Sequence, residues 1–397
     1  METPRRQDRQ VAPVGRNLTY RSEARMENGI CTAALSPSDF SVPALVRAPL
    51  VTFTPVRQAG VAPENYHATS VFPEYFKLGQ GDWRLLRESR MDCVVVLTHE
   101  GDLAVTEFRR LQVGDRVACG RGENAEDGIW VHPEGFEWPR RSVEKFAFRT
   151  RITRETSFSI DYDELHDLLE HEREHGFILW VLGPAVTFDH DARGAFSQLV
   201  ERGFVQALLA GNALAVHDIE AALFQTALGQ EIYTKRAAAL GHYKHLDAIN
   251  RIRALGSIAR GLDQGLIRDG IMDAVLRRRV PFVLAGSIRD DGPLPEVIAD
   301  VYQAQDRMRA LTRRATTVIA MATQLHAIAV GNMVPSYAVT AEETVRPVYF
   351  YSVDMSEFAV NKLANRGSVT ARSILTNVQD FVVTVERGLR KRETGCR

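Results

Sequence analysis

The chain is poor in the residues that build metal centres and disulfide frameworks. Its 397 residues include only four cysteines, which are scattered and form no CxxC pair or Cys/His cluster. Zinc sites and small disulfide-stapled folds both need characteristic cysteine spacings, so this pattern argues against both. We therefore expect no metal site and a reducing, cytoplasmic compartment. The cysteines are Cys31, Cys93, Cys119 and Cys396.

The sequence also lacks an excess of one charge and a long apolar run. Lys and Arg number 49 against 50 Asp and Glu, which leaves a formal net charge of −1. No global field therefore attracts the chain to nucleic acid or to a membrane. The apolar stretch 318–330 is interrupted by Gln324 and His326 and is too short to span a bilayer. The basic residues 1–10 precede no apolar segment, so we expect no signal peptide.

Composition and periodicity divide the chain into three parts. Residues 1–65 are rich in Arg, Pro, Ser and Thr, and we predict a partly irregular extension. Residues 66–165 contain short apolar or alternating runs separated by Gly and Pro, which predicts a small β-rich module. Residues 166–397 change to long apolar runs that alternate with amphipathic segments. The runs in the middle part lie at 91–97, 111–118 and 146–152.

The C-terminal part has the pattern of a parallel α/β sheet. Strands that alternate with helices predict a doubly wound parallel sheet. The strands are continuous apolar runs, as expected where helices cover both faces. We predict strands at 177–184, 204–210, 281–285, 316–322 and 348–353, and helices at 192–202, 213–228, 245–255, 258–279, 294–314 and 358–366.

The most informative segment is the loop after the third of these strands. Residues 283–295 run from an apolar strand through two small residues and the charged triplet 289–291 into a Gly-Pro-x-Pro exit. Ligands of α/β proteins bind at the carboxyl ends of strands. A structural turn rarely needs three consecutive charges there, so we favour a ligand-binding loop over a solvated turn.

Small or polar residues end other strands as well. Gly183 and Gly211 would let a phosphate approach the backbone, and Asn212 is placed to cap a helix whose N-terminus binds anions. Asp354 ends a strand where an acid can bind a ribose diol. Each feature also has a structural interpretation, namely a capped helix or close packing. The dinucleotide fingerprint GxGxxG does not occur in the chain.

Together these segments resemble the archaeal-type ornithine cyclodeaminase family. Its conserved domain is named after lysine-oxoglutarate reductase/saccharopine dehydrogenase (LOR/SDH), and it also forms the C-terminal half of cyanobacterial arginine dihydrolase/ornithine cyclodeaminases. The matching segments cover about residue 66 to the end, and the most specific are 211–220 and 284–295. The resemblance implies a Rossmann-like domain, bound NAD, and conversion of L-ornithine or a related diamino acid to a cyclic, proline-like product with loss of ammonia.

The chain departs from the family pattern around these segments. The family's His-Thr-Gly-Ala turn is replaced within 186–192, and its Gly-Thr-Ser-Leu-Gly is Gln-Thr-Ala-Leu-Gly at 225–229. Segments 137–142 and 361–368 differ too. The sequence therefore indicates the cofactor more specifically than it indicates the substrate. An amino-acid or opine-type dehydrogenase with net redox chemistry is one alternative, and a non-catalytic NAD-binding regulatory protein is another. We also expect a homo-oligomer.

These arguments lead to a set of predicted site residues. NAD is expected across the carboxyl ends of the strands. A diamino acid brings two cations, and buried cations need paired acids, so acids of the two most specific segments should face the substrate. One of these acids, or a histidine, would act as the base. A guanidinium or a lysine of the β-rich module would hold the substrate carboxylate. The cofactor-binding residues are Gly183, Gly211, Asn212, Ala213, Gly286, Ser287, Gly331, Asn332 and Asp354; the catalytic ones Asp218, Asp291 and His217; and the substrate-binding ones Asp290, Arg289 and Lys77.

Overall fold

The computed structural model describes residues 26–27, 30–31, 34–35, 38–137, 162–290, 292–339, 345–356 and 370–395. The strand predicted at 146–152, the helix predicted at 358–366 and Asp291 lie outside these ranges.

The centre of the molecule is a seven-stranded parallel sheet with the order β17-β16-β13-β12-β18-β21-β22. The chain builds outward from β12 through β13 to β16, and then returns to begin the other half at β18, beside β12. This reversal of strand order is the topological switch point of a Rossmann-type sheet. The strands are β12 (Ile178–Leu182), β13 (Ala207–Gly211), β16 (Phe282–Ala285), β17 (Val297–Ile298), β18 (Thr317–Met321), β21 (Tyr349–Asp354) and β22 (Thr370–Leu375).

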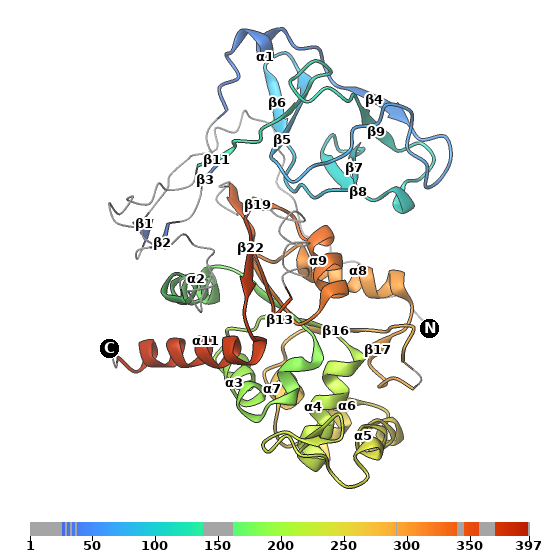
Figure 1. Ribbon diagram of the computed structural model, residues 1–397. Helices are drawn as coiled ribbons and strands as arrows, with labels where there is room; N and C mark the ends of the chain where they lie inside the picture. The colour runs from blue at the N-terminus through green and yellow to red at the C-terminus, as the bar shows by residue number, and fades with distance from the viewer. Residues whose placement is uncertain are drawn as a thin grey trace.

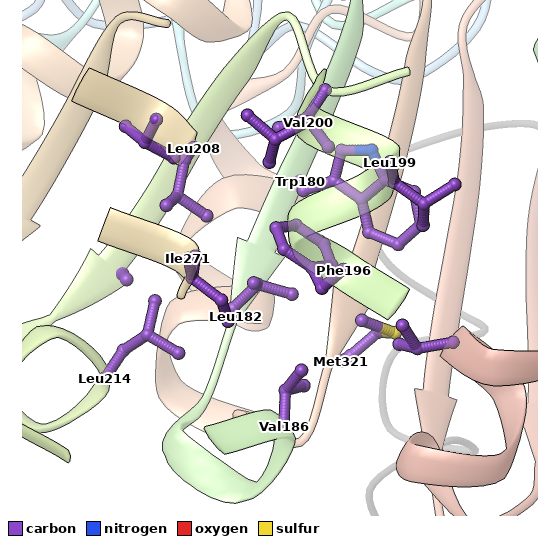
Figure 2. Close-up of a cluster of buried hydrophobic side chains, with 14 of the residues drawn as sticks. Trp180, Leu182, Val186, Phe196, Leu199, Val200, Leu208, Leu214, Ile271 and Met321 are labelled. Atoms are coloured by element: carbon purple, nitrogen blue, oxygen red, sulfur yellow. The ribbon is translucent and has the colours of Figure 1, made fainter. Parts of the chain in front are cut away.

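Alternate residues of β12 enter two different hydrophobic cores. Trp180 and Leu182 pack in a core built by the helices of one face, whereas Leu179 and Val181 pack against α8 and α9 on the other. Figure 2 shows Trp180 beside Phe196 of α3. Both faces are therefore covered, which explains the continuous apolar runs. The first face carries α2 (Tyr162–His175), α3 (His190–Glu201), α4 (Asn212–Phe224), α5 (Gly241–Leu255), α7 (Ile271–Arg277) and α11 (Val378–Glu393), and the second α8 (Val301–Thr312) and α9 (Gln324–Met333).

One predicted helix is interrupted, and another starts later than expected. The segment 258–279 forms α6 (Ile258–Asp263) and α7, which are separated by Gly265 and Gly270 at positive φ. Such a backbone cannot continue a right-handed helix. The segment 294–314 first forms β17 and becomes helical only at Val301.

The N-terminal module contains the antiparallel sheets β4-β9-β7-β8 and β10-β5-β6 and, among the described residues, a short antiparallel pairing of Ala34–Leu35 with Phe136–Glu137. Strand β4 pairs with β9 and so belongs to the module although it precedes residue 66, while α2 begins before residue 165 and packs against α11. The strands are β4 (Thr52–Pro55), β5 (Glu74–Gly79), β6 (Asp82–Leu85), β7 (Val94–Leu97), β8 (Leu103–Thr106), β9 (Arg116–Cys119) and β10 (Ile129–Val131), and α1 (Pro43–Arg47) precedes them.

The module packs against the amino-terminal end of the parallel sheet. Helices α8 and α9 start at the carboxyl ends of strands, and the module contacts α8 from its middle onward, at Asp306 and Arg309, and the residues that follow α9. Ser336 donates its amide to the carbonyl of Ser89 at 2.8 Å, and the hydroxyl of Tyr337 donates to the carbonyl of Leu86. Figure 1 shows the module above the sheet, with α4, α5 and α6 at the opposite end.

Candidate functional site

The carboxyl edge of the parallel sheet gathers the residues predicted at strand ends. Gly183 follows β12, Gly211 ends β13, Gly286 follows β16 and Asp354 ends β21. Because these strands are parallel and in register, their ends lie along one edge. These residues therefore share one region of the fold, and their contact with a cofactor stays a prediction.

In the described part of the chain, two α-helices that directly follow strands begin at this edge without a side-chain cap. The N-cap residues Gly211 of α4 and Thr323 of α9 accept no hydrogen bond through a side chain. By contrast, Asp189 caps α3, Asp300 caps α8 and Asn377 caps α11. Uncapped amides and the helix dipole favour an anion. The two uncapped helices follow the strands on either side of β12, so the switch point carries the positive helix ends.

Asn212 does not cap a helix as expected. It is the first residue of α4, and its Oδ1 accepts the amide of Leu294 at 3.1 Å. This bond ties the end of the 286–295 loop to the start of α4. Ala213, the next residue, is half-buried at the same helix end.

The glycines at this edge allow close approaches. A Cβ on Gly183 would lie 1.8 Å from the carbonyl oxygen of Ala322, which itself has a positive φ of 51°. Gly183 is therefore needed to pack β12 against the end of β18, and its contact with a cofactor stays a prediction. A Cβ on Gly211 would lie 3.2 Å from Cε1 of His326.

His326 is a candidate catalytic residue that was not among the predicted ones. It is the third residue of α9, after β18, yet its ring lies against Gly211 at the end of β13. Since β12 separates these strands, the imidazole lies over the carboxyl end of β12. Burial lowers the pKa of His326, and the charge of Asp290 opposes this effect only in part. The ring is thus neutral at pH 7 and able to accept a proton.

The charged loop is organised by its own side chains. The amide of Ser287 donates to Oδ2 of Asp290 at 2.8 Å, and the amide of Arg289 donates to Oγ of Ser287 at 3.2 Å. Gly286 donates its amide to the carbonyl of Ile298 at 2.9 Å. Arg289 is exposed and Asp290 is half-buried beside His326, so both carry charge at the carboxyl edge.

The structure contradicts the role predicted for Asp218. The residue is fully buried, and its Oδ1 accepts Nε of Arg193 at 2.6 Å and the amide of Ile271 at 3.0 Å. Its Oδ2 accepts the amide of Met272 at 2.7 Å. With both oxygens occupied, Asp218 joins α3, α4 and α7 and does not face a substrate.

Lys77 is also not a substrate ligand in this structure. It is buried in the β-rich module, where Nζ donates to the carbonyls of Leu45, Val46 and Ala48 at 3.2, 2.8 and 2.7 Å. It therefore holds the end of α1. The module lies at the amino-terminal end of the sheet, away from the candidate site.

Gly331 and Asn332 lie at the wrong end of their helix for cofactor binding. They occupy the last turn of α9, seven or more residues after its start. At a rise of 1.5 Å per residue, this is about 10 Å from the carboxyl edge. Gly331 is buried beside the core residue Val330.

His217 lies near the start of α4 and forms a pair with a residue that was not predicted, Glu220. The distance between Nδ1 of His217 and Oε2 of Glu220 is 2.9 Å. The imidazole packs edge-on to Phe188 at 5.5 Å, in the 3₁₀ helix η2 (Pro184–Phe188) that follows β12. His217 thus lies beside the carboxyl edge. Glu220 lies at the end of the specific segment 211–220, which is the signal that could have identified it.

In the described part of the chain, no group of three or more His, Cys, Asp or Glu residues is arranged to hold a metal ion. Nor does any helix in those ranges have the length and hydropathy to cross a bilayer.

Comparison with known sequences shows that the chain is similar to ornithine cyclodeaminases and to ArgZ-like proteins. A family model described as the C-terminal Rossmann fold of arginine dihydrolase ArgZ-like proteins matches residues 163–385. The ornithine cyclodeaminase of Methanopyrus kandleri is 36% identical over 343 residues, covering 86% of this chain and 79% of the relative. That of Archaeoglobus fulgidus is 39% identical over 325 residues, covering 81% and 74%. The bifunctional arginine dihydrolase/ornithine cyclodeaminase AgrE of Nostoc is 34% identical over 343 residues, covering 85% of this chain and 46% of that protein.

Solved structures show the same relationship. A conserved LOR/SDH protein of Methanococcus maripaludis superposes with a TM-score of 0.77 at 33% identity, covering 87% of this chain and 99% of that one. The ternary complex of AgrE with ornithine and NAD+ superposes with a TM-score of 0.53 at 32% identity, covering 88% of this chain and 47% of AgrE.

Proposed function

The chain belongs to the archaeal-type ornithine cyclodeaminase family, and we propose that it converts L-ornithine to L-proline with release of ammonia. The observation that carries this proposal is the carboxyl edge of the sheet. There, two uncapped helix ends, an imidazole and a charged loop meet at the switch point. Such an edge suits a dinucleotide together with a charged amino acid.

NAD is the cofactor that fits this edge. Its pyrophosphate needs amide donors, and the first turns of α4 and α9 provide them without competing caps. Gly211 and the half-buried Ala213 themselves add no bulky side chain at the start of α4. Bound NAD+ supplies a hydride acceptor that oxidises the carbon bearing the α-amine and later returns the hydride, so the reaction has no net redox change.

The charged loop is the proposed binding site for the polar groups of ornithine. Oδ2 of Asp290 accepts the amide of Ser287, which leaves Oδ1 for the δ-ammonium. Arg289 is exposed at the same loop and provides a guanidinium for the carboxylate. Asp291 stays a predicted ligand of an ammonium group.

Two histidines provide the proton transfers that the reaction requires. The α-ammonium must lose a proton before the hydride can leave, and we assign this proton to His217. The δ-ammonium must then lose a proton to attack the imine, and the departing amine must gain one. His326 is neutral and lies over the end of β12, so it suits this second transfer. In the overall reaction, one ornithine gives one proline and one ammonia.

The test is a stoichiometric assay with substoichiometric NAD+. The 397-residue protein is incubated with L-ornithine, L-lysine, L-2,4-diaminobutyrate and L-arginine, and ammonia, proline and NADH are measured. We expect ammonia and proline in equal amounts from ornithine without accumulation of NADH. NADH formed in proportion to product would instead identify an amino-acid or opine-type dehydrogenase. Binding of NAD without any product would contradict the catalytic proposal.

A further inference from the structure

Helix α4 carries a buried pair of a histidine and a carboxylate, and the hydrogen bonds of this pair indicate a catalytic as well as a structural role. His217 and Glu220 are one helical turn apart, and Glu220 is fully buried. The side chain of His217 retains 9% of its exposure, beside η2 and α5. A carboxylate placed so deeply next to an imidazole needs further donors to offset its desolvation.

Glu220 receives all the hydrogen bonds that its carboxylate can accept. Oε1 accepts the hydroxyl of Thr226 at 2.9 Å and the amide of Gly229 at 3.1 Å, and Oε2 accepts the amide of Leu228 at 3.1 Å in addition to His217. Burial by itself would raise the pKa of Glu220, but the hydrogen bonds from His217, Gly229 and Thr226 lower it below its ordinary value. The carboxylate is therefore ionised and has no acceptor site left for a substrate.

This ionised carboxylate determines the tautomer of His217. A carboxylate can only accept, so Nδ1 of the imidazole must carry the hydrogen that points to Oε2. In the neutral ring, the lone pair is then on Nε2. Nε2 makes no hydrogen bond with the residues that the structure describes. The ring thus presents a free proton acceptor at the carboxyl edge.

A strained turn supplies the two backbone donors. Leu228 and Gly229 connect β14 (Thr226–Ala227) to β15 (Gln230–Glu231) with φ values of 52° and 73°. Positive φ at both positions defines the tight hairpin turn in which Gly and Asn are favoured and leucine is not. The leucine side chain is exposed, so the turn uses its amide and not its side chain. A Cβ on Gly229 would lie 2.8 Å from the backbone carbon of Gly241, which fixes the turn against α5.

We propose that Glu220, held by Thr226 and the amides of Leu228 and Gly229, is a positioning residue that keeps Nε2 of His217 ready to deprotonate the substrate's α-ammonium. This inference rests on the function proposed above. The N–H bond of the ammonium breaks, its proton moves to Nε2, and the resulting imidazolium is stabilised by Glu220. The electron pair left on the amine then forms the C=N bond as the hydride leaves for NAD+.

The primary test compares Glu220→Gln with Glu231→Gln, an exposed glutamate on the same hairpin. Glutamine offers one acceptor oxygen and an NH₂ group, so it cannot satisfy four donors, and an NH₂ group facing His217 favours the wrong tautomer. We expect Glu220→Gln to lower kcat about 100-fold to 10,000-fold, the range of general base catalysis. KM for ornithine and the affinity for NAD should change little, and Glu231→Gln should behave as wild type.

A double variant separates positioning from a general loss of structure. If Glu220 acts through His217, then His217→Gln and the double variant Glu220→Gln/His217→Gln have the same kcat/KM. Multiplicative effects of the two substitutions would contradict the proposal. Thr226→Val keeps the charge and removes one donor, and it should give a smaller fall in kcat with normal folding. It therefore tests the proposal if Glu220→Gln does not fold.

Nitrogen NMR of histidine-labelled protein gives a readout independent of turnover. The signals of His217 are identified by their loss in His217→Gln. We expect the Nδ1–H tautomer in the wild-type protein and loss of that tautomer in Glu220→Gln. The same tautomer in both would overturn the positioning role. If the wild-type protein makes no proline, the proposed function fails, and this measurement still decides whether Glu220 fixes His217.

Discussion

The imidazole of His326 lies so close to Gly211 that a Cβ on the glycine would come within 3.2 Å of Cε1. His326 lies in α9, which follows β18, whereas Gly211 ends β13, and β12 lies between these two strands. A group able to accept a proton is thus held beside the first amides of α4. The residue proposed to transfer a proton therefore lies next to the proposed cofactor site.

Replacing His326 should therefore affect turnover more than folding. We expect His326→Gln to lower kcat/KM for ornithine about 100-fold or more, because a general acid–base group is lost. Burial lowers the pKa of His326, so the neutral ring persists to a pH below the ordinary histidine value of 6.5. The contribution of His326 should thus be constant at pH 7 and above and be lost on the acidic side. Steady-state kinetics across this range measure both effects, and unchanged kinetics would contradict the assignment.

The control for this variant is His242→Gln, since His242 is an exposed histidine near the start of α5. It should leave kcat/KM and its pH dependence as in the wild-type protein. An equal loss of activity in both variants would point to a general effect of removing histidines.

Gly183 should tolerate no side chain, because a Cβ would meet the carbonyl oxygen of Ala322. We expect Gly183→Ala to lower the free energy of unfolding by about 1–3 kcal/mol, as overpacking does. Gly194→Ala in α3 is the matched control, since its Cβ would have no neighbour within 4 Å. Alanine in a helix should raise the stability there by about 0.5–1 kcal/mol. Urea unfolding of both variants tests this, and equal stabilities would contradict the packing argument.

Asp218 should be important for stability and not for chemistry. Asp218→Asn leaves the buried Arg193 without its closest charge partner, which should cost about 3–5 kcal/mol of unfolding free energy. Asp269→Asn removes the exposed second partner of Arg193 and should cost about 1 kcal/mol or less. The folded fraction of Asp218→Asn should retain the wild-type kcat. A loss of kcat at unchanged stability would return Asp218 to the active site.

Lys77 should likewise affect the stability of the fold and not the binding of ornithine. Lys77→Met removes the donor to three carbonyl groups around the end of α1, and we expect a loss of about 1–3 kcal/mol in unfolding free energy. KM for ornithine should stay unchanged because the module lies away from the carboxyl edge. A large increase in KM without a change in stability would restore Lys77 as a substrate ligand.

The parallel sheet could be predicted from the sequence because its strands are continuous apolar runs. The strand-end residues followed from it, since parallel strands share one carboxyl edge. The breaks within 258–279 were harder to predict because Gly265 and Gly270 are compatible with helix by periodicity alone. Helix α2 was missed because its sequence is strongly charged and only one side of it is buried.

The incorrect predictions of site residues from the sequence have a common physical cause. Whether Asp218 faces a ligand or Arg193 depends on how α3 packs against α4, which no local pattern encodes. The position of Lys77 likewise depends on which edge of the sheet the module contacts. The same holds for His326 and Glu220, whose partners lie in other elements of the chain.

The central claim is that one hydride leaves the substrate and returns to the same carbon skeleton. The most direct measurement uses L-ornithine deuterated at Cα, with unlabelled NAD+ in substoichiometric amount, and mass spectrometry of the proline formed. The proposed reaction predicts proline that carries deuterium at Cα, equimolar ammonia and no net NADH. Product without deuterium, together with one deuterated NADH for each ornithine consumed, would contradict the cyclodeaminase reaction and identify a net oxidation.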